Sequence, residues 1–106
     1  MHIQVNSNHS ITVSQALEER VRATLEGELE RFDEYLTRLE VHLNDENASR
    51  SGPQDKRCQI EARLKHHDPL SVTHKADSLE LAIDGAAEKM HHALDHLIGK
   101  LSRRTD

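Results

Sequence analysis

The sequence predicts an α+β fold in the order β-α-β-β-β-α, with a four-stranded sheet and two helices on one of its faces. Four segments alternate apolar and polar residues at the two-residue period of a strand, and two longer segments repeat apolar residues at the helical period. Because the strands are apolar on one side only, the sheet needs cover on that side alone. The 106 residues are expected to form one small domain, residues 1–106.

The first strand and the first helix come from the N-terminal third of the chain. Residues 2–6 ("HIQVN") alternate, which places Ile3 and Val5 on one side of a short strand. After a loop, Ser14 is suited to cap a helix from about residue 15 to about residue 34, because its hydroxyl can accept from a free amide of the first turn. The apolar residues that share one face of this helix are Leu17, Val21, Leu25, Leu29, Phe32 and Leu36.

Three further strands follow the first helix. Residues 37–44, 56–65 and 70–75 alternate apolar and polar side chains. The polar stretch at 45–55 predicts a long loop, and "HHDP" at 66–69 predicts a turn. The strand residues expected to point inward are Leu39, Val41, Leu43, Cys58, Ile60, Ala62 and Leu64. Of these, Val41, Cys58 and Ile60 are expected to be buried, together with Ile83 of the last helix.

The last helix sorts its charges onto two flanks. Asp77 is suited to cap it, Glu80 completes the spacing of a capping box, and the helix is expected to end near residue 102. Its apolar stripe consists of Leu79, Ala82, Ile83, Ala86, Met90, Ala93, Leu94, Leu97 and Leu101. The acidic flank consists of Glu80, Asp84, Glu88 and Asp95, and His91 lies with it. The opposite flank, at helical spacing, consists of Lys89, His92, His96, Lys100 and Arg103.

The composition limits the classes of function. The net charge is −5, with ten acidic against five basic residues in 1–50 and nine against nine in 51–106. There is no global basic field, so nucleic-acid binding would need a local patch. Cys58 is the only cysteine, which excludes a disulfide framework. No signal peptide and no membrane-spanning stretch is visible, so we expect a soluble, cytoplasmic protein without a membrane partner.

Metal binding and catalysis are weaker interpretations of the histidines. His92 and His96 have the four-residue spacing of a metal pair on a helix, but a zinc site needs further ligands, and the candidates are His66, His67 and His74. The sequence lacks HExxH, GxSxG, a phosphate-binding loop and a dinucleotide fingerprint. We therefore expect no catalytic residue, no metal, no cofactor and no small-molecule substrate.

Two segments resemble a known family. The stretch "LELAIDGAAEKMHHALDHLIGKL" (79–101), in the order of elements given above, is similar to the ribosome hibernation promoting factor and ribosome-associated inhibitor family, also called the sigma-54 modulation proteins. "ITVSQALEERV" (11–21) resembles the opening of that family's first helix. The resemblance to its short form implies a double-stranded-RNA-binding-domain-like fold. It also implies binding to the small ribosomal subunit and its ribosomal RNA, which blocks translation and preserves idle ribosomes under stress and in stationary phase.

Candidate RNA-binding residues follow from the resemblance and from the charges. Basic residues of the last helix contact ribosomal RNA in that family, and the matching positions include His92 and His96, where lysine or arginine is usual. Ile98 also stands at a position that is commonly basic. The candidates on the helix are Lys89, His92, His96, Lys100, Arg103 and Arg104, and those on and beside the strands are Arg57, Arg63, Lys65 and Lys75.

A non-ribosomal adaptor of the same fold is the alternative. The first helix carries acidic side chains that could serve a protein partner, namely Glu18, Glu19, Glu26 and Glu30. Sedimentation separates the two hypotheses, because a ribosome binder travels with small subunits at low salt and leaves them as salt rises.

Overall fold

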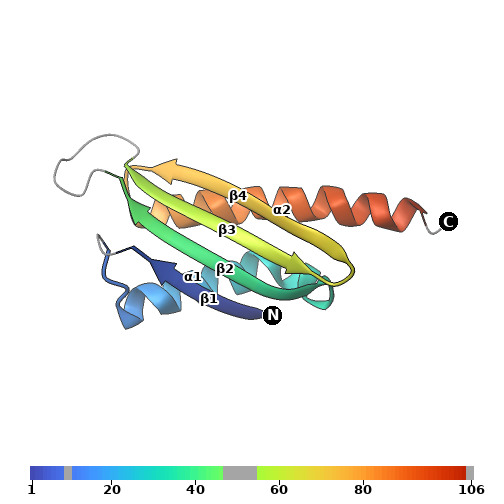
Figure 1. Cartoon of the computed structure of the whole chain (residues 1–106), viewed down its shortest axis with the longest axis horizontal. Helices are drawn as coiled ribbons and strands as arrows, with labels where there is room; N and C mark the ends of the chain where they lie inside the picture. Colours follow the sequence, from blue (N-terminus) through green and yellow to red (C-terminus); the bar gives the residue numbers. More distant parts are fainter. Residues whose placement is uncertain (9–10, 47–54, 105–106) are drawn as a thin grey trace.

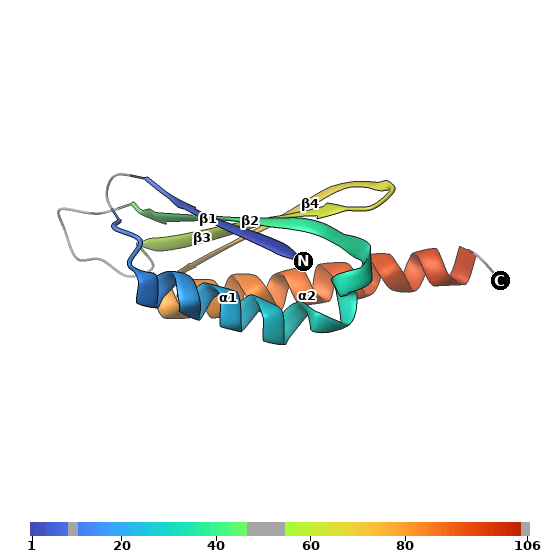
Figure 2. The ribbon, with the colours of Figure 1, turned by 90° about the horizontal axis from the view of Figure 1, so that it is seen from below.

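A four-stranded sheet with two helices on one face forms the molecule, as the sequence predicts (Figures 1 and 2). The computed structural model describes residues 1–8, 11–46 and 55–104, with only the backbone for 101–104. Its elements are β1 (His2–Ser7), α1 (Gln15–Leu29), the 3₁₀ helix η1 (Glu30–Tyr35), β2 (Leu36–Asp45), β3 (Lys56–Leu64), β4 (His67–Ala76) and α2 (Leu79–Arg104). The strand order is β1-β2-β3-β4, with β1 parallel to β2 and the other pairs antiparallel.

The first helix begins where it is predicted to begin and ends early. The Ser14 hydroxyl accepts a hydrogen bond from the Leu17 amide at 3.1 Å, which confirms the cap. The α-helix ends at Leu29, and residues 30–35 form a 3₁₀ helix where the sequence predicts one continuous α-helix. The tighter winding keeps Leu29 and Phe32, three residues apart, on the same buried side just before the chain enters β2.

The last helix is capped by Ser78 and not by Asp77, so that prediction is wrong by one residue. The Ser78 hydroxyl accepts from the Leu81 amide at 3.2 Å, and its carbonyl accepts from the Ala82 amide at 3.0 Å. Strand β4 extends to Ala76, which leaves Ser78 as the residue at the helix boundary. Glu80 then occupies the second helical position and not the capping-box position.

The β3–β4 turn is tighter than predicted. Lys65 and His66 form a two-residue turn, and residues 67–69, predicted as part of the turn, already belong to β4. Pro69 fits there because β4 is an edge strand, where a missing amide hydrogen costs no ladder bond. Residues 47–54 of the predicted loop at 45–55 lie outside the described residues. Strand β2 reaches Asp45, one residue further than predicted, and β3 begins at Lys56, as predicted.

The core lies between the helices and one face of the sheet. Val41, Cys58, Ile60 and Ile83 are fully buried, as predicted. Gly85 is required where α2 crosses β4, because a Cβ at that position would collide with the imidazole of His74. The other face of the sheet has no helix over it, and the C-terminal end of α2 extends past the β3–β4 turn (Figures 1 and 2).

Candidate nucleic-acid interface

Two carboxylates on the acidic flank of α2 pair with arginines of the α1–η1 segment. Asp84 pairs with Arg20 at 3.3 Å, and Asp95 pairs with Arg31 at 3.0 Å. All four side chains are about half exposed, so each pair contributes no more than about 1 kcal/mol to stability. The two pairs matter for the charge of the surface, because they neutralise two carboxylates of α2 before the protein meets a partner.

His91 belongs to the contact between the two helices. Its Nδ1 lies 2.9 Å from the carbonyl oxygen of Glu28, and its ring meets Phe32 edge-to-face with centroids 5.2 Å apart. The side chain is partly buried. His91 therefore contributes to the packing between the two helices. It lies on the acidic flank of α2, as the helical spacing predicts, and not on the basic flank.

The basic flank runs beside the free edge of β4. The Lys89 ammonium donates a hydrogen bond to the carbonyl oxygen of Thr73 at 2.9 Å, which ties α2 to that edge. His96 and Lys100 follow about two and three turns further along the same flank, and His96 and Lys100 are both exposed. His92 departs from the prediction that it shares this flank: it is exposed on the side nearer α1, 3.9 Å from Glu88, and lines a shallow hollow with Thr24.

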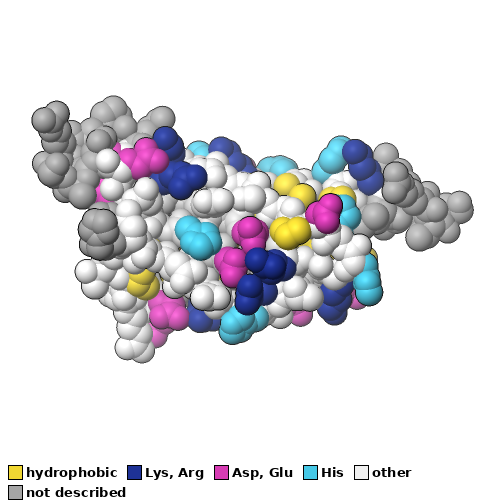
Figure 3. Space-filling view, viewed as in Figure 1, with side chains coloured by type: hydrophobic (Ala, Val, Ile, Leu, Met, Phe, Trp, Pro, Cys, Tyr) yellow, Lys and Arg dark blue, Asp and Glu magenta, His cyan; other side chains and the backbone are white. Residues whose placement is uncertain are grey.

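The strand candidates lie on the opposite, uncovered face of the sheet. Arg57 and Lys75 are register partners on β3 and β4, and both reach Glu46, at 3.8 and 3.0 Å. Arg63 lies 3.3 Å from Glu61 and also contacts the neighbouring β2. Figure 3 shows basic and acidic side chains in contact near the centre of this face. The sheet cations are therefore paired within the protein.

The pairing divides the described lysines and arginines into two sets. Those that form an ion pair with a carboxylate are Arg20, Arg22, Arg31, Arg38, Lys56, Arg57, Arg63 and Lys75. Within the described part of the chain, those that pair with no carboxylate are Lys65, Lys89 and Lys100. The uncompensated positive charge therefore lies on α2 and at the β3–β4 turn, although the chain as a whole is acidic.

Comparisons with known proteins identify the family and the fold. The family model described as "Sigma 54 modulation protein / S30EA ribosomal protein" matches residues 3–102. The chain belongs to this family. No curated protein matches its sequence. The fold is that of the Protein Y N-terminal domain of Thermus thermophilus, at 18% identity and a TM-score of 0.74 over 92% of this chain and 99% of that one.

A second solved structure has the same fold. It is a ribosomal subunit interface protein from Coxiella burnetii, at 16% identity and a TM-score of 0.76 over 93% of this chain and 99% of that one. Membership of the sigma-54 modulation and S30EA family indicates a ribosome-associated factor, and that family is not an enzyme family.

The remaining histidines do not form a metal centre with the helical pair. His74 lies on the helix-covered face of β4 against Gly85, whereas His66 and His67 lie at the β3–β4 turn. Within the described residues, no three His, Cys, Asp or Glu side chains come together to hold a metal ion. The sequence could not exclude such a site, because it does not show which strands meet the helix.

The thiol of Cys58 is buried in the core. Burial raises the pKa of the Cys58 thiol to about 12, which keeps it protonated and unreactive.

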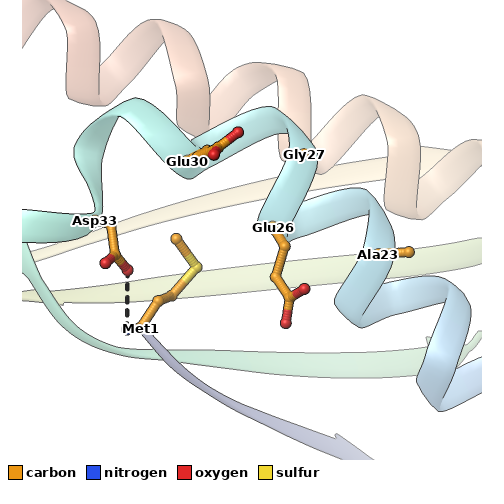
Figure 4. A pocket seen from close by; sticks show the side chains of 6 residues that line it. All are labelled: Met1, Ala23, Glu26, Gly27, Glu30 and Asp33. Carbon is orange, nitrogen blue, oxygen red and sulfur yellow. Dashed lines mark ion pairs between the residues drawn. The ribbon is translucent and has the colours of Figure 1, made fainter.

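A hollow of about 820 Å³ lies between the start of β1 and the α1–η1 segment, where the Met1 ammonium pairs with Asp33 at 2.9 Å (Figure 4). Its acidic side chains are those of Glu26, Glu30 and Asp33.

Among the described helices, none is long and apolar enough to cross a bilayer.

Proposed function

We propose that this protein is a hibernation-type factor that binds the small ribosomal subunit through α2. The basic track of Lys89, His92, His96 and Lys100, continued by Arg103 and Arg104, contacts phosphates of ribosomal RNA, and the bound protein blocks translation on idle ribosomes. The observation that supports this most is the set of α2 cations without a carboxylate partner in a chain of net charge −5. Membership of a ribosome-associated family supports it independently.

The pairing of charges explains how an acidic protein can bind RNA. A lysine that already neutralises a carboxylate releases few counterions when it meets a phosphate, whereas an unpaired lysine contributes its full charge. Asp84 and Asp95 are directed to Arg20 and Arg31, away from the β4 side of the helix. The free energy of binding then comes from one helix flank. Arg57, Arg63 and Lys75 contribute less, because each must leave a carboxylate first.

Lys89 is held in place before binding. Its single described hydrogen bond joins the ammonium to a neutral carbonyl and leaves two donors for a phosphate. The side chain loses less conformational freedom on binding than a free lysine would. We further propose that the protein acts in the cytoplasm, without enzymatic activity, cofactor or small-molecule substrate.

Sedimentation through a sucrose gradient tests the proposal. The protein should travel with purified small subunits at about 50 mM salt and remain at the top at about 300 mM, because phosphate contacts weaken steeply with salt. A double variant, K89Q with K100Q, should remain at the top even at low salt. K75Q is the control, because it also removes a lysine charge but from a pair with Glu46, and it should sediment almost like the wild type.

The adaptor hypothesis predicts another result. If wild-type protein stays at the top of the gradient at every salt concentration, ribosome binding is ruled out. The acidic hollow lined by Glu26, Glu30 and Asp33 would then be the first surface to test for a protein partner.

A further inference from the structure

The β3–β4 turn places three basic residues together at one end of the molecule. Lys65 and His66 form the turn, His67 begins β4, and all three side chains are exposed. Lys65 is the one described cation outside α2 that pairs with no carboxylate. Asp68 is the neighbouring acid, and His67 Nδ1 lies 2.8 Å from the backbone oxygen of Asp68, not from its carboxylate.

The turn is held rigidly. The Lys65 amide donates to the carbonyl oxygen of Tyr35 at 3.0 Å, and the Thr37 hydroxyl donates to the carbonyl oxygen of Arg63 at 3.0 Å. These bonds fasten the turn to the η1–β2 junction. A basic side chain on such a support loses little backbone entropy when it binds.

His66 is exposed at the second position of the turn. Its φ of 61° lies in the left-handed region, which a two-residue turn requires and which histidine adopts more readily than most residues. Its imidazole makes no hydrogen bond or ion pair with the described residues. The ring is therefore accessible to a partner.

The turn and the end of α2 lie at the same end of the long axis. Figures 1 and 2 share that axis, and in both the turn lies at the level of the C-terminal half of α2, which carries His96 and Lys100. Figure 2 shows the turn and the helix diverging there. The two elements thus carry separate basic groups near the same end of the molecule.

We propose that the β3–β4 turn is a second phosphate-binding element, which acts with α2 on one RNA partner. Lys65 contacts the RNA backbone directly, and His66 donates a hydrogen bond to a phosphate. His67 donates from Nε2 when its ring is protonated, because its Nδ1 faces the carbonyl oxygen of Asp68. The partner is structured RNA recognised through its backbone, because the chain contains no Trp, its one Phe is buried, its one Tyr is partly buried, and base stacking needs exposed rings. This inference rests on the proposed function for the RNA partner.

A comparison of two single lysine variants tests the turn. K65Q and K75Q change the net charge equally, and both lysines lie beside or within β4. The affinity of each variant is measured for small ribosomal subunits and, separately, for a double-helical RNA of about 20 base pairs, between about 50 and 200 mM salt. K65Q should bind about three- to tenfold more weakly, with a salt slope shallower by about one, whereas K75Q stays near the wild type. K65R should restore most of the affinity.

The outcomes separate this inference from the proposed function. If the wild type binds small subunits and K65Q binds them with the same affinity and the same salt slope, the turn is not a phosphate-binding site. The proposed function would be unaffected by that result. An equal loss in K65Q and K75Q would also overturn it, because the effect would then be one of total charge. If the wild type binds the double-helical RNA but not the small subunits, the proposed function is wrong. The affinity of K65Q for that RNA would then still test the role of the turn. No binding to either would overturn both.

Discussion

The imidazole of His74 lies directly against the backbone of Gly85, at the point where α2 crosses the inner face of β4. This contact sets the height of α2 above the sheet edge. It also sets the reach of the Lys89 ammonium, one helical turn further on, to the Thr73 carbonyl. A glycine in the middle of a long helix thus positions the flank that carries the candidate RNA contacts.

Gly85→Ala should destabilise the protein, although alanine is the better helix former. The added methyl must displace His74 or the helix, and such overpacking costs about 1–3 kcal/mol. Gly27→Ala is the matched control, because nothing lies within 4 Å of its Cβ position, and it should stabilise by about 0.5–1 kcal/mol. Urea unfolding monitored by circular dichroism measures both. Equal stabilisation by the two variants would contradict the close contact.

Binding to small subunits should strengthen as pH falls from about 7.5 to about 6. Histidine is the side chain that gains charge in this range, and protonation of His92 and His96 adds positive charge to the track. Glu88 on the same helix lies 3.9 Å from His92, and Glu28 of α1 and Asp84 line the same hollow. Affinity measured at fixed salt across this range checks the prediction.

A lysine pair supplies the control for that pH series. Replacing His92 and His96 together by lysine should tighten binding at pH 7.5 and remove most of the pH dependence, because lysine is charged throughout the range. Equal wild-type affinity at both ends of the range would mean that the two histidines are ordinary surface residues.

Cys58 should stay unreactive toward a thiol reagent in the native protein at pH 8. Its thiol is buried and its pKa is raised by that burial to about 12 from the ordinary 9.0, with Arg57 opposing the shift. As pH rises, the unfolded chain therefore loses this proton first. The free energy of unfolding should fall between about pH 9 and pH 12, and less so in Cys58→Ala. Rapid labelling at pH 8 without denaturant would contradict the burial.

Zinc should change the melting temperature by no more than about 2 °C. His92 and His96 supply two ligands at most, and the described residues bring no third ligand to them. Thermal unfolding with equimolar zinc, and again with a chelator, measures this. A large stabilisation that saturates at one zinc per chain would restore the metal hypothesis.

The boundaries that the sequence missed are those set by contacts between distant residues. Residues 30–35 keep a helical pattern of apolar residues, and only the approach to β2 shows why the winding tightens there. Asp77 and Ser78 are equally good caps by type, and the length of β4 decides between them. Pro69 looks like a turn residue until β4 is known to be an edge strand.

The sequence by itself determined the kind and order of the elements, the buried face of each strand and the two flanks of the last helix. It could do so because a strand and a helix repeat at fixed short periods, so the side of each residue is a local property. Only the tertiary structure decided which charges remain uncompensated. Arg57 and Lys75 share Glu46 across the sheet, and Asp95 meets Arg31 between helices, because ion pairs depend on distances that join residues far apart in the chain. Those distances leave Lys65, Lys89 and Lys100 without a carboxylate among the described residues, and they locate the candidate RNA surface.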